Sequence, residues 1–201
     1  MTDGPGRTGG LRISDPQVMR ALAHPARIEI VEYLNSSGAS VTATEMAEMV
    51  GLSPSASSYH LRELAKYGLV EHAPSRGDGR ERVWRATSSG VHIDGDPDQP
   101  EAWAAERALI DLYLHRDLTR VTEWLDRQAE EPPEWRDAGA MMGQLLLLDA
   151  DELAALSEQV RALMEPYRMR LREAGEAPKG ARQVRINYLA FPTSPAGEDS
   201  L

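Results

Sequence analysis

The pattern of apolar and polar positions in residues 53–68 predicts a short helix with two unlike faces. Ser53 can cap the free N–H groups at its start, Pro54 fits the first helical position, and Gly68 can end it in a left-handed turn. One face is small or apolar and should pack inward: Ser57, Leu61, Leu64 and Ala65. The opposite face carries hydroxyls, a phenol and cations: Ser55, Ser58, Tyr59, Arg62 and Lys66. A face of this kind suits the major groove of DNA, although many solvated helix faces have a similar composition.

The segments on either side of this helix place it in a larger pattern. Residues 42–45 read Thr-Ala-Thr-Glu, which has the spacing of a capping box, and they open a helix that Gly51 ends. Two helices joined by so tight a turn indicate a helix-turn-helix. Residues 69–73 and 82–86 alternate like strands around a loop rich in Arg and Gly, which predicts a hairpin, or wing, after the second helix.

Residues from about Leu22 to Ala86 therefore resemble the winged helix-turn-helix of ArsR-type bacterial regulators. The resemblance is carried by ALAHPAR and IEIVEYL at residues 21–34, by SYHL at 58–61 with GLV at 68–70, and by RERVW at 80–84. It implies a homodimer whose two recognition helices bind double-stranded DNA one helical turn apart, on a pseudo-palindromic operator. It also implies that the first helix, expected from residue 14 or 15, contributes to the dimer contact through Val18, Met19 and Leu22.

The DNA-contacting residues that we predict lie on the second helix and in the wing. Ser55, Ser58 and Tyr59 should approach base edges, because small polar side chains allow close approach to the groove. Arg62 suits a base or a phosphate and Lys66 a phosphate, whereas the wing cations suit the minor groove or the backbone. A histidine at position 60 fits a DNA contact and the edge of the core equally well. The full predicted set is Ser53, Ser55, Ser57, Ser58, Tyr59, His60, Arg62, Lys66, Arg76, Arg80 and Arg82.

A long helix is predicted from residue 101 to about residue 130, where neither Gly nor Pro occurs. Its apolar residues recur at helical spacing and form a stripe longer than a small domain needs for its own core. The simplest use is contact with a second copy of the chain, through Ile110, Leu114, Leu118, Val121 and Leu125. Residues 88–100, which are interrupted by Gly, Pro and Ser, separate this helix from the wing as a linker.

The rest of the chain predicts a strand, a helix and a second strand. Residues 141–148 are a short apolar run and residues 184–191 alternate, while a capping box at residues 149–152 opens the helix between them. Two strands alone are only marginally stable, so these must pack on the helices or join a sheet across a dimer.

The fold class is therefore mainly α (α+β), with a winged helix-turn-helix domain followed by a helical C-terminal region with two short strands. We expect a disordered tail at residues 1–13, the DNA-binding domain at 14–87, the linker at 88–100, a dimerisation or effector region at 101–191 and a tail at 192–201.

The chain is acidic, with a net charge of −10 at pH 7, which by itself repels DNA. The charge is segregated, because residues 1–90 contain ten basic and ten acidic residues and all the excess acid lies in residues 91–201. The predicted DNA-binding segment, residues 54–85, carries six cations against four anions. This small surplus predicts binding that needs two copies of the motif and low to moderate salt.

Other chemistry is thinly represented in the sequence. There is no cysteine, so disulfides and thiolate metal sites are excluded, and the five histidines are scattered without metal-binding spacing. No catalytic constellation, phosphate loop or dinucleotide fingerprint occurs, so we expect no enzyme activity, no metal and no cofactor. No apolar run is long enough for a membrane span and no signal-peptide pattern is present, so we expect a cytoplasmic protein without a membrane partner.

We interpret the sequence as a transcriptional regulator, in the simplest case a repressor, and two alternatives stay open. Aromatic residues gathered in the C-terminal half leave open a ligand-gated regulator that binds a small apolar effector there, although packing in a core or an interface is the simpler use of these residues. In the other alternative the winged helix docks on a protein partner, and the acidic half of the chain repels DNA.

Overall fold

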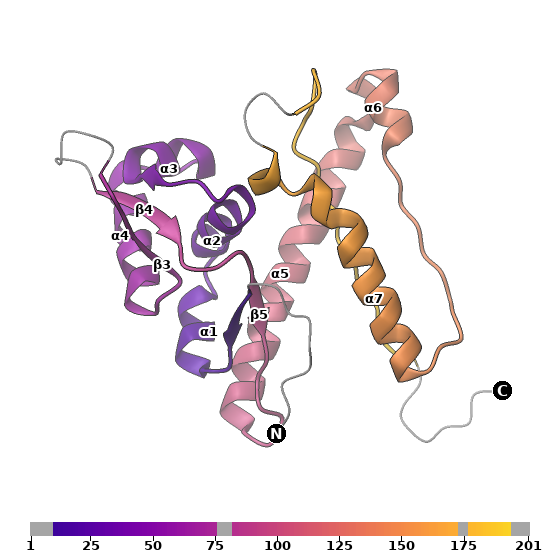
Figure 1. Ribbon diagram of the computed structural model, residues 1–201, viewed down its shortest axis with the longest axis horizontal. Coiled ribbons are helices and arrows are strands. Elements are labelled where there is room, and N and C mark those ends of the chain that lie inside the picture. Colours follow the sequence, from indigo (N-terminus) through magenta and orange to yellow (C-terminus); the bar gives the residue numbers. More distant parts are fainter. Residues whose placement is uncertain (1–9, 76–81, 173–176, 194–201) are drawn as a thin grey trace. The chain divides into compact units, whose positions relative to one another are not determined.

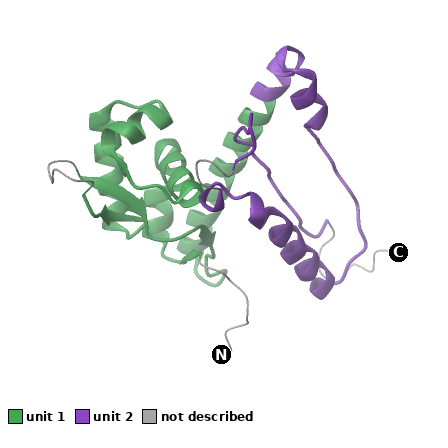
Figure 2. Cartoon of the chain, turned by 45° about the horizontal axis from the view of Figure 1, so that its top comes forward, with its two compact units in different colours: residues 1–122 green, residues 123–201 purple. Residues whose placement is uncertain are grey.

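The computed structural model describes residues 10–75, 82–172 and 177–193, and it divides the chain into two units (Figure 2). The N-terminal unit comprises Met1–Thr122 and the C-terminal unit Glu123–Leu201. The tip of the predicted wing, with Arg76 and Arg80, lies outside the described residues. Among the described residues, no helix is both long and apolar enough to cross a membrane.

The N-terminal unit is a helical domain with short strands (Figure 1). In chain order its elements are β1 (Leu11–Ile13), α1 (Pro16–Leu22), α2 (Pro25–Ser37), β2 (Val41–Thr42), α3 (Ala43–Val50), α4 (Pro54–Lys66), β3 (Val70–Ala73), β4 (Val83–Ala86), β5 (Val91–Ile93) and α5 (Pro100–Arg127), whose last residues belong to the C-terminal unit. That unit continues with α6 (Pro133–Ala138), α7 (Ala150–Met164) and single 3₁₀ turns at Gln128–Glu130, Glu165–Tyr167 and Met169–Leu171. The predicted mainly α (α+β) architecture, a winged helix-turn-helix followed by a helical region, is confirmed.

Side-chain caps and glycines set the ends of the helices, as the sequence predicts. The Thr42 hydroxyl accepts a hydrogen bond from the Glu45 N–H at 3.2 Å, and the Glu45 carboxylate accepts one from the Thr42 N–H at 2.7 Å, which completes the capping box. The Ser53 hydroxyl accepts a hydrogen bond from the first turn of α4 at 3.2 Å. Gly51 and Gly68 follow α3 and α4 with φ values of 67° and 68°, a conformation that favours glycine.

Two small sheets complete the N-terminal unit. β2, β4 and β3 form an antiparallel sheet in that order, and the β3–β4 hairpin is the base of the predicted wing. β1 pairs in parallel with β5, so that Leu11 lies opposite Val91 and Ile13 opposite Ile93. The side chain of Ile13 is buried in the core, which anchors this second sheet to the helices.

The β1–β5 pair differs from the predicted domain limits. Residues 1–13 were expected to be a tail and residues 88–100 a linker, but each of these segments contributes a strand to the N-terminal unit. Glycines and prolines dominate the local pattern on both sides of the two strands. The pairing joins segments far apart in the sequence, so no local periodicity indicates it.

The core of the N-terminal unit is built by α1 to α5 and by the strands β1 to β4. Fully buried side chains include Ile28, Ile30 and Leu34 of α2, Met46 of α3, Leu61 and Leu64 of α4, and Leu109 of α5. Met19 and Leu22 of α1 are fully buried in the same core, and Val18 is partly buried against it. The prediction that Met19 and Leu22 contact a second copy is therefore wrong, because their apolar surface is already covered within one chain.

In the C-terminal unit, α7 begins at the predicted capping box, where the Asp149 carboxylate accepts a hydrogen bond from the Glu152 N–H at 2.8 Å. The two predicted strands are not formed. Residues 141–148 and 184–191 run as extended chain (Figure 1), but neither segment pairs with a strand in the described part of the chain. A strand exists only when its N–H and C=O groups have a partner, which the apolar pattern of the sequence does not supply.

Replacing Gly68 with alanine should lower the free energy of unfolding by about 1–2 kcal/mol, because its left-handed backbone is strained for a residue with a Cβ. The added Cβ would meet nothing within 4 Å, so the loss would reflect backbone strain and not a clash. Gly90→Ala is the matched control, since its Cβ is equally free and its φ is not left-handed. It should change stability by less than about 0.5 kcal/mol. Urea denaturation measures both values, and equal stabilities would argue against the strain.

Candidate nucleic-acid interface

Helix α4 presents a continuous polar strip to solvent. Ser55, Tyr59 and Arg62 are exposed, and 49% of the Tyr59 surface is accessible. Ser58 is half-buried beside them, and Lys66 is exposed at the end of the helix. These positions recur every three or four residues, so their side chains share one side of α4. The predicted outer face of the helix is therefore present, and we call these five residues the α4 strip.

Two members of the predicted contact set lie on the other side of α4. Ser57 is fully buried, and only 7% of His60 is exposed. Side chains enclosed by the core do not reach a DNA duplex, so the structure contradicts the predicted DNA contacts of Ser57 and His60. The helical spacing already places Ser57 on the inward face, and His60 has the other of its two predicted roles, at the edge of the core.

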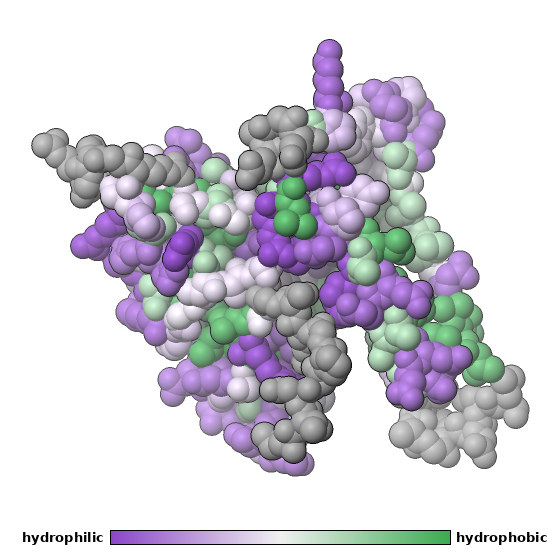
Figure 3. Space-filling model, viewed as in Figure 1, coloured by the Kyte–Doolittle hydropathy of each residue, from purple (hydrophilic) through white to green (hydrophobic). Residues whose placement is uncertain are grey.

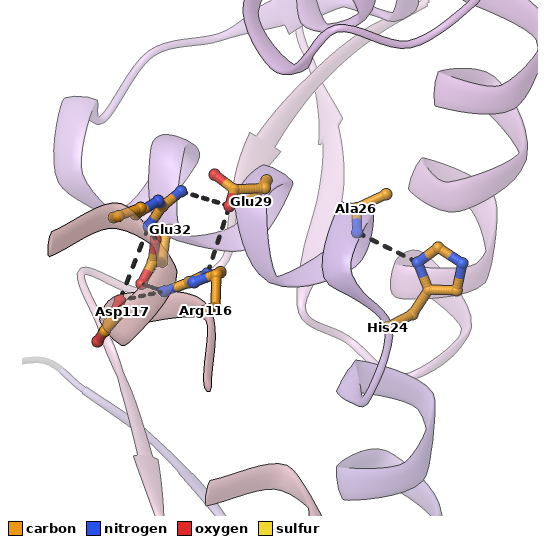
Figure 4. Close-up of polar contacts among 7 residues, drawn as sticks. His24, Ala26, Glu29, Glu32, Arg116 and Asp117 are labelled. Atoms are coloured by element: carbon orange, nitrogen blue, oxygen red, sulfur yellow. Dashed lines mark hydrogen bonds and ion pairs between the residues drawn. The ribbon is translucent and has the colours of Figure 1, made fainter. Parts of the chain in front are cut away.

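His60 packs against a second histidine. The ring centroids of His24 and His60 are 4.6 Å apart. His24 Nδ1 accepts a hydrogen bond from the Ala26 N–H at 3.2 Å and so caps α2 (Figure 4), which requires this nitrogen to carry no proton. Burial lowers the pKa of His60, and the adjacent His24 and Arg27 lower it further. Glu63 opposes this shift of the His60 pKa, which remains below its ordinary value.

A pocket opens beside the α4 strip, where α3 begins. Its volume is about 170 Å³, and it is bounded by the first residues of α3, by α4 and by the start of β4. Arg62 and Arg82 line it with two exposed guanidinium groups. Thr44 and Ser58 add hydroxyls, and Trp84 adds an apolar surface. Guanidinium groups favour anions, so the chemistry of this pocket suits an anionic group such as a phosphate.

The other cations near the α4 strip are paired with acids. Lys66 forms an ion pair with Glu63 one turn earlier, and this hydrogen bond raises the pKa of Lys66. Arg85 pairs with Glu71 across the β3–β4 hairpin at 2.6 Å. Within the described residues, Arg62 makes no hydrogen bond and no ion pair, so its guanidinium group is available to a ligand.

A second polar cluster joins α2 to α5 (Figure 4). Arg116 pairs with Glu32 and lies 3.7 Å from a carboxylate oxygen of Glu29. Arg120 pairs with Glu29, and the side chains of both arginines are largely buried. Burial raises the pKa of the neighbouring Tyr113 to about 12, with a further contribution from Glu32. This α2–α5 cluster fixes the long helix to the helix-turn-helix.

α5 has two faces with different surroundings. Its inner face is buried against the core of the N-terminal unit through Ala102, Ala105 and Leu109. Its predicted apolar stripe is on the other face, where the exposed fractions are 37% for Ile110, 43% for Leu114, 66% for Leu118 and 47% for Leu125, and where Val121 is half-buried. Removing this exposed apolar surface from water would be favourable.

The sequence analysis missed the pocket and the α2–α5 cluster. Thr44 belongs to the capping-box segment and Trp84 to a strand, and only the fold brings them beside Arg62. The sequence does contain a pattern that indicates the cluster. Arg116 and Arg120 lie four positions apart, among the apolar residues of the inner face of α5. In the described part of the chain, no group of three or more His, Asp or Glu side chains is arranged to hold a metal ion.

Comparison with known proteins gives one family match, which lies in the middle of the N-terminal unit. Residues 22–73 match the family model of a helix-turn-helix domain. No curated protein matches the chain.

Among solved structures, a possible transcriptional regulator for arsenical resistance is 29% identical over 53% of this chain and 93% of its own, with a TM-score of 0.30. The YusO protein of Bacillus subtilis is 20% identical over 58% and 84%, with a TM-score of 0.34. A zinc-responsive MarR family member, ZitR of Lactococcus lactis, is 14% identical over 72% and 76%, with a TM-score of 0.32.

Lowering the pH should destabilise the chain through His60. Because its pKa is lowered in the folded state, the unfolded chain binds the proton more readily below the ordinary value near 6.5. The stability that is present above this value is therefore lost as the pH falls through the lowered pKa of His60. Calorimetry should show a steeper fall of Tm for the wild type than for His60→Gln, while exposed His115→Gln behaves like the wild type. The same pH dependence in His60→Gln and wild type would contradict this role of His60.

Proposed function

We propose that this chain, which carries an ArsR-like winged helix-turn-helix, acts as a homodimer on a pseudo-palindromic DNA operator. The helix-turn-helix match at residues 22–73 supports the general part of this function, a DNA-binding transcriptional regulator. The α4 strip is the observation that carries the specific proposal. A dimer that covers its operator excludes other proteins from it, so repression is the simplest consequence of binding.

The composition of the α4 strip supports direct contact with bases. Ser55 and Ser58 are small enough for the helix backbone to approach the floor of the major groove, and their hydroxyls donate and accept hydrogen bonds. Tyr59 adds a phenol on the same side. Arg62 has the planar donor arrangement that recognises O6 and N7 of guanine, and its guanidinium is exposed.

The pocket at the start of α3 supports contact with the DNA backbone. Arg82 would hold one phosphate, while Arg62 stands between this phosphate and the base edges. Phosphate contacts set the position of a protein along the duplex without reading its sequence. In this proposal the pocket fixes the register and the α4 strip reads the bases.

The exposed stripe of α5 supports the homodimer. Leu114 and Leu118 lie on the face that points away from the core, and the stripe is long enough for a second α5 to cover. A two-fold pair of recognition helices would then lie roughly 34 Å apart, one turn of DNA. Two copies also double the small cationic surplus of residues 54–85, which compensates for the acidity of the rest of the chain.

Selection of genomic DNA fragments with the purified full-length chain tests this function. We expect enrichment of one sequence with two-fold symmetry and half-sites about 10 base pairs apart. Enrichment should weaken as salt is raised, because phosphate contacts release counterions. Recovery of fragments without any common sequence would argue against the proposal and favour a winged helix that binds a protein.

Arg62→Ala should lower affinity for the selected operator by about 1–3 kcal/mol, which is roughly 5- to 150-fold. The Tm should change little, because Arg62 is exposed and contributes nothing to the core. Arg107→Ala is the matched control, since it removes an exposed arginine of α5 that pairs only with Asp111, one turn away. It should leave affinity within about twofold in a fluorescence anisotropy titration. Equal affinities of the two variants would remove Arg62 from the interface.

Leu118→Glu should weaken the homodimer, because it places a charge in the middle of the α5 stripe. We expect the dimer dissociation constant to rise by about tenfold or more in analytical ultracentrifugation. Thr119→Glu adds the same charge at the next exposed position of α5, outside the stripe, and should change the constant much less. A dimer that tolerates both substitutions equally would exclude the stripe as its interface.

A further inference from the structure

The C-terminal unit has no core of its own. Its described residues are 123–172 and 177–193, and not one of them is buried. The N-terminal unit, in contrast, fully buries side chains from each of its main helices. Ordering a chain segment costs about 1–2 kcal/mol per residue, which only burial of apolar surface can offset. The fold of the C-terminal unit is therefore incomplete until something covers it.

The uncovered apolar surface is concentrated on two extended segments. Apolar segment 1, residues 141–148, exposes 81% of Met142, 85% of Leu145 and 80% of Leu147. Apolar segment 2, residues 184–191, exposes about two-thirds of the surface of Val184, Ile186, Leu189 and Phe191. Hydrophobic residues follow the chain between α6 and α7 in the space-filling view (Figure 3). Segment 2 is rich in the β-branched and aromatic residues that favour strands, and both segments are extended chain without a pairing partner among the described residues.

The two segments match each other in length and differ from the rest of the chain in charge. Each has eight residues and would span about 26 Å as a strand. Segment 1 has no charged residue, and segment 2 has Arg185 as its only one, in a chain with 32 acidic residues. Two copies that each carry a charge of −10 repel one another over most of their surfaces. At these segments they can meet without that repulsion.

Helix α7 lies beside segment 2 without burying its side chains. The Tyr188 hydroxyl of segment 2 lies 3.4 Å from the Ser157 hydroxyl of α7, so the helix runs beside this segment. A helix packed on one face of a small sheet is a stable two-layer arrangement, but two strands are too few to form that sheet. Two segments from each of two copies provide four strands.

We propose that apolar segments 1 and 2 form an intermolecular β-sheet with the same segments of a second copy of this chain. This inference rests on the proposed homodimer and adds to it a second contact, in which each C-terminal unit completes its fold only in the presence of its partner. Backbone hydrogen bonds between the copies satisfy the open strand edges, and the leucines of segment 1 gain a core.

Hydrogen exchange of the full-length chain, measured by mass spectrometry at several concentrations without DNA or lipid, tests the sheet directly. The amides of residues 141–148 and 184–191 should be protected at least about tenfold where the chain is dimeric and should lose this protection on dilution. Fast exchange of both segments in the dimer would overturn the proposal and leave the α5 contact intact. Protection that persists in a monomer would overturn it as well, because the strands would then pair within one copy.

Two further experiments separate this contact from other roles of the C-terminal unit. Leu147→Asp should raise the dimer dissociation constant at least about tenfold and abolish the protection of both segments, whereas Leu171→Asp, at an exposed leucine outside them, should do neither.

Because the chain has no cysteine, the variants Leu145→Cys and Ile186→Cys can be mixed and cross-linked with a short bismaleimide. A covalent dimer is expected, and its absence for these two positions together with unchanged dimerisation of Leu147→Asp would overturn the proposal.

Failure of this proposal is distinguishable from failure of the proposed function. The genomic selection tests DNA binding through the α4 strip, whereas hydrogen exchange measures only the protection of the C-terminal segments. An enriched palindrome with unprotected segments would refute the sheet alone. Protected segments without any enriched DNA sequence would refute the operator alone.

Discussion

The burial of the inward face of α4 is the contact on which the arrangement of the N-terminal unit depends. Leu61 and Leu64 are fully buried, and each buried leucine contributes about 1.5–3 kcal/mol. Ser57 is buried with them, and its small side chain lets α4 lie close to its neighbours. This contact fixes the rotation of α4 about its own axis, so Tyr59 and Arg62 face solvent as a consequence. The polar strip is held in place by the packing on its opposite side.

The α2–α5 cluster fixes the position of the long helix α5 relative to α2. Buried ion pairs add little net stability, because removing charges from water costs about as much as their attraction returns, but they are selective for geometry. Arg116 and Arg120 are one helical turn apart, and so are Glu29 and Glu32, so both pairs form in only one register of α5 along α2. The register in turn fixes which side of α5 is covered by the core and which side carries the exposed stripe.

Features set by neighbouring residues were predictable, and features set by distant contacts were not. The Thr42 capping box, the Ser53 cap and the glycine at position 68 act within a few residues, so their local pattern is sufficient. The position of His60 depends on which side chain α4 meets, here His24, and the strand at residues 11–13 depends on a partner 80 positions away. The apolar runs near residues 145 and 186 predict strands, but strand formation needs a second backbone, and none pairs with them in the described part of the chain.

α5 is attached to the rest of the N-terminal unit along its inner face, from its first turn to the Arg116 ion pairs. The short connection from β5, itself paired with β1, holds its first turn, and the Arg116 ion pairs hold it again roughly 24 Å further along its axis. A helix held at two separated points cannot rotate about either one. The first half of α5 is therefore expected to move together with α2 as one rigid element. A force on the part of α5 just beyond Arg116 is therefore passed to α2, whose buried side chains share one core with those of α4.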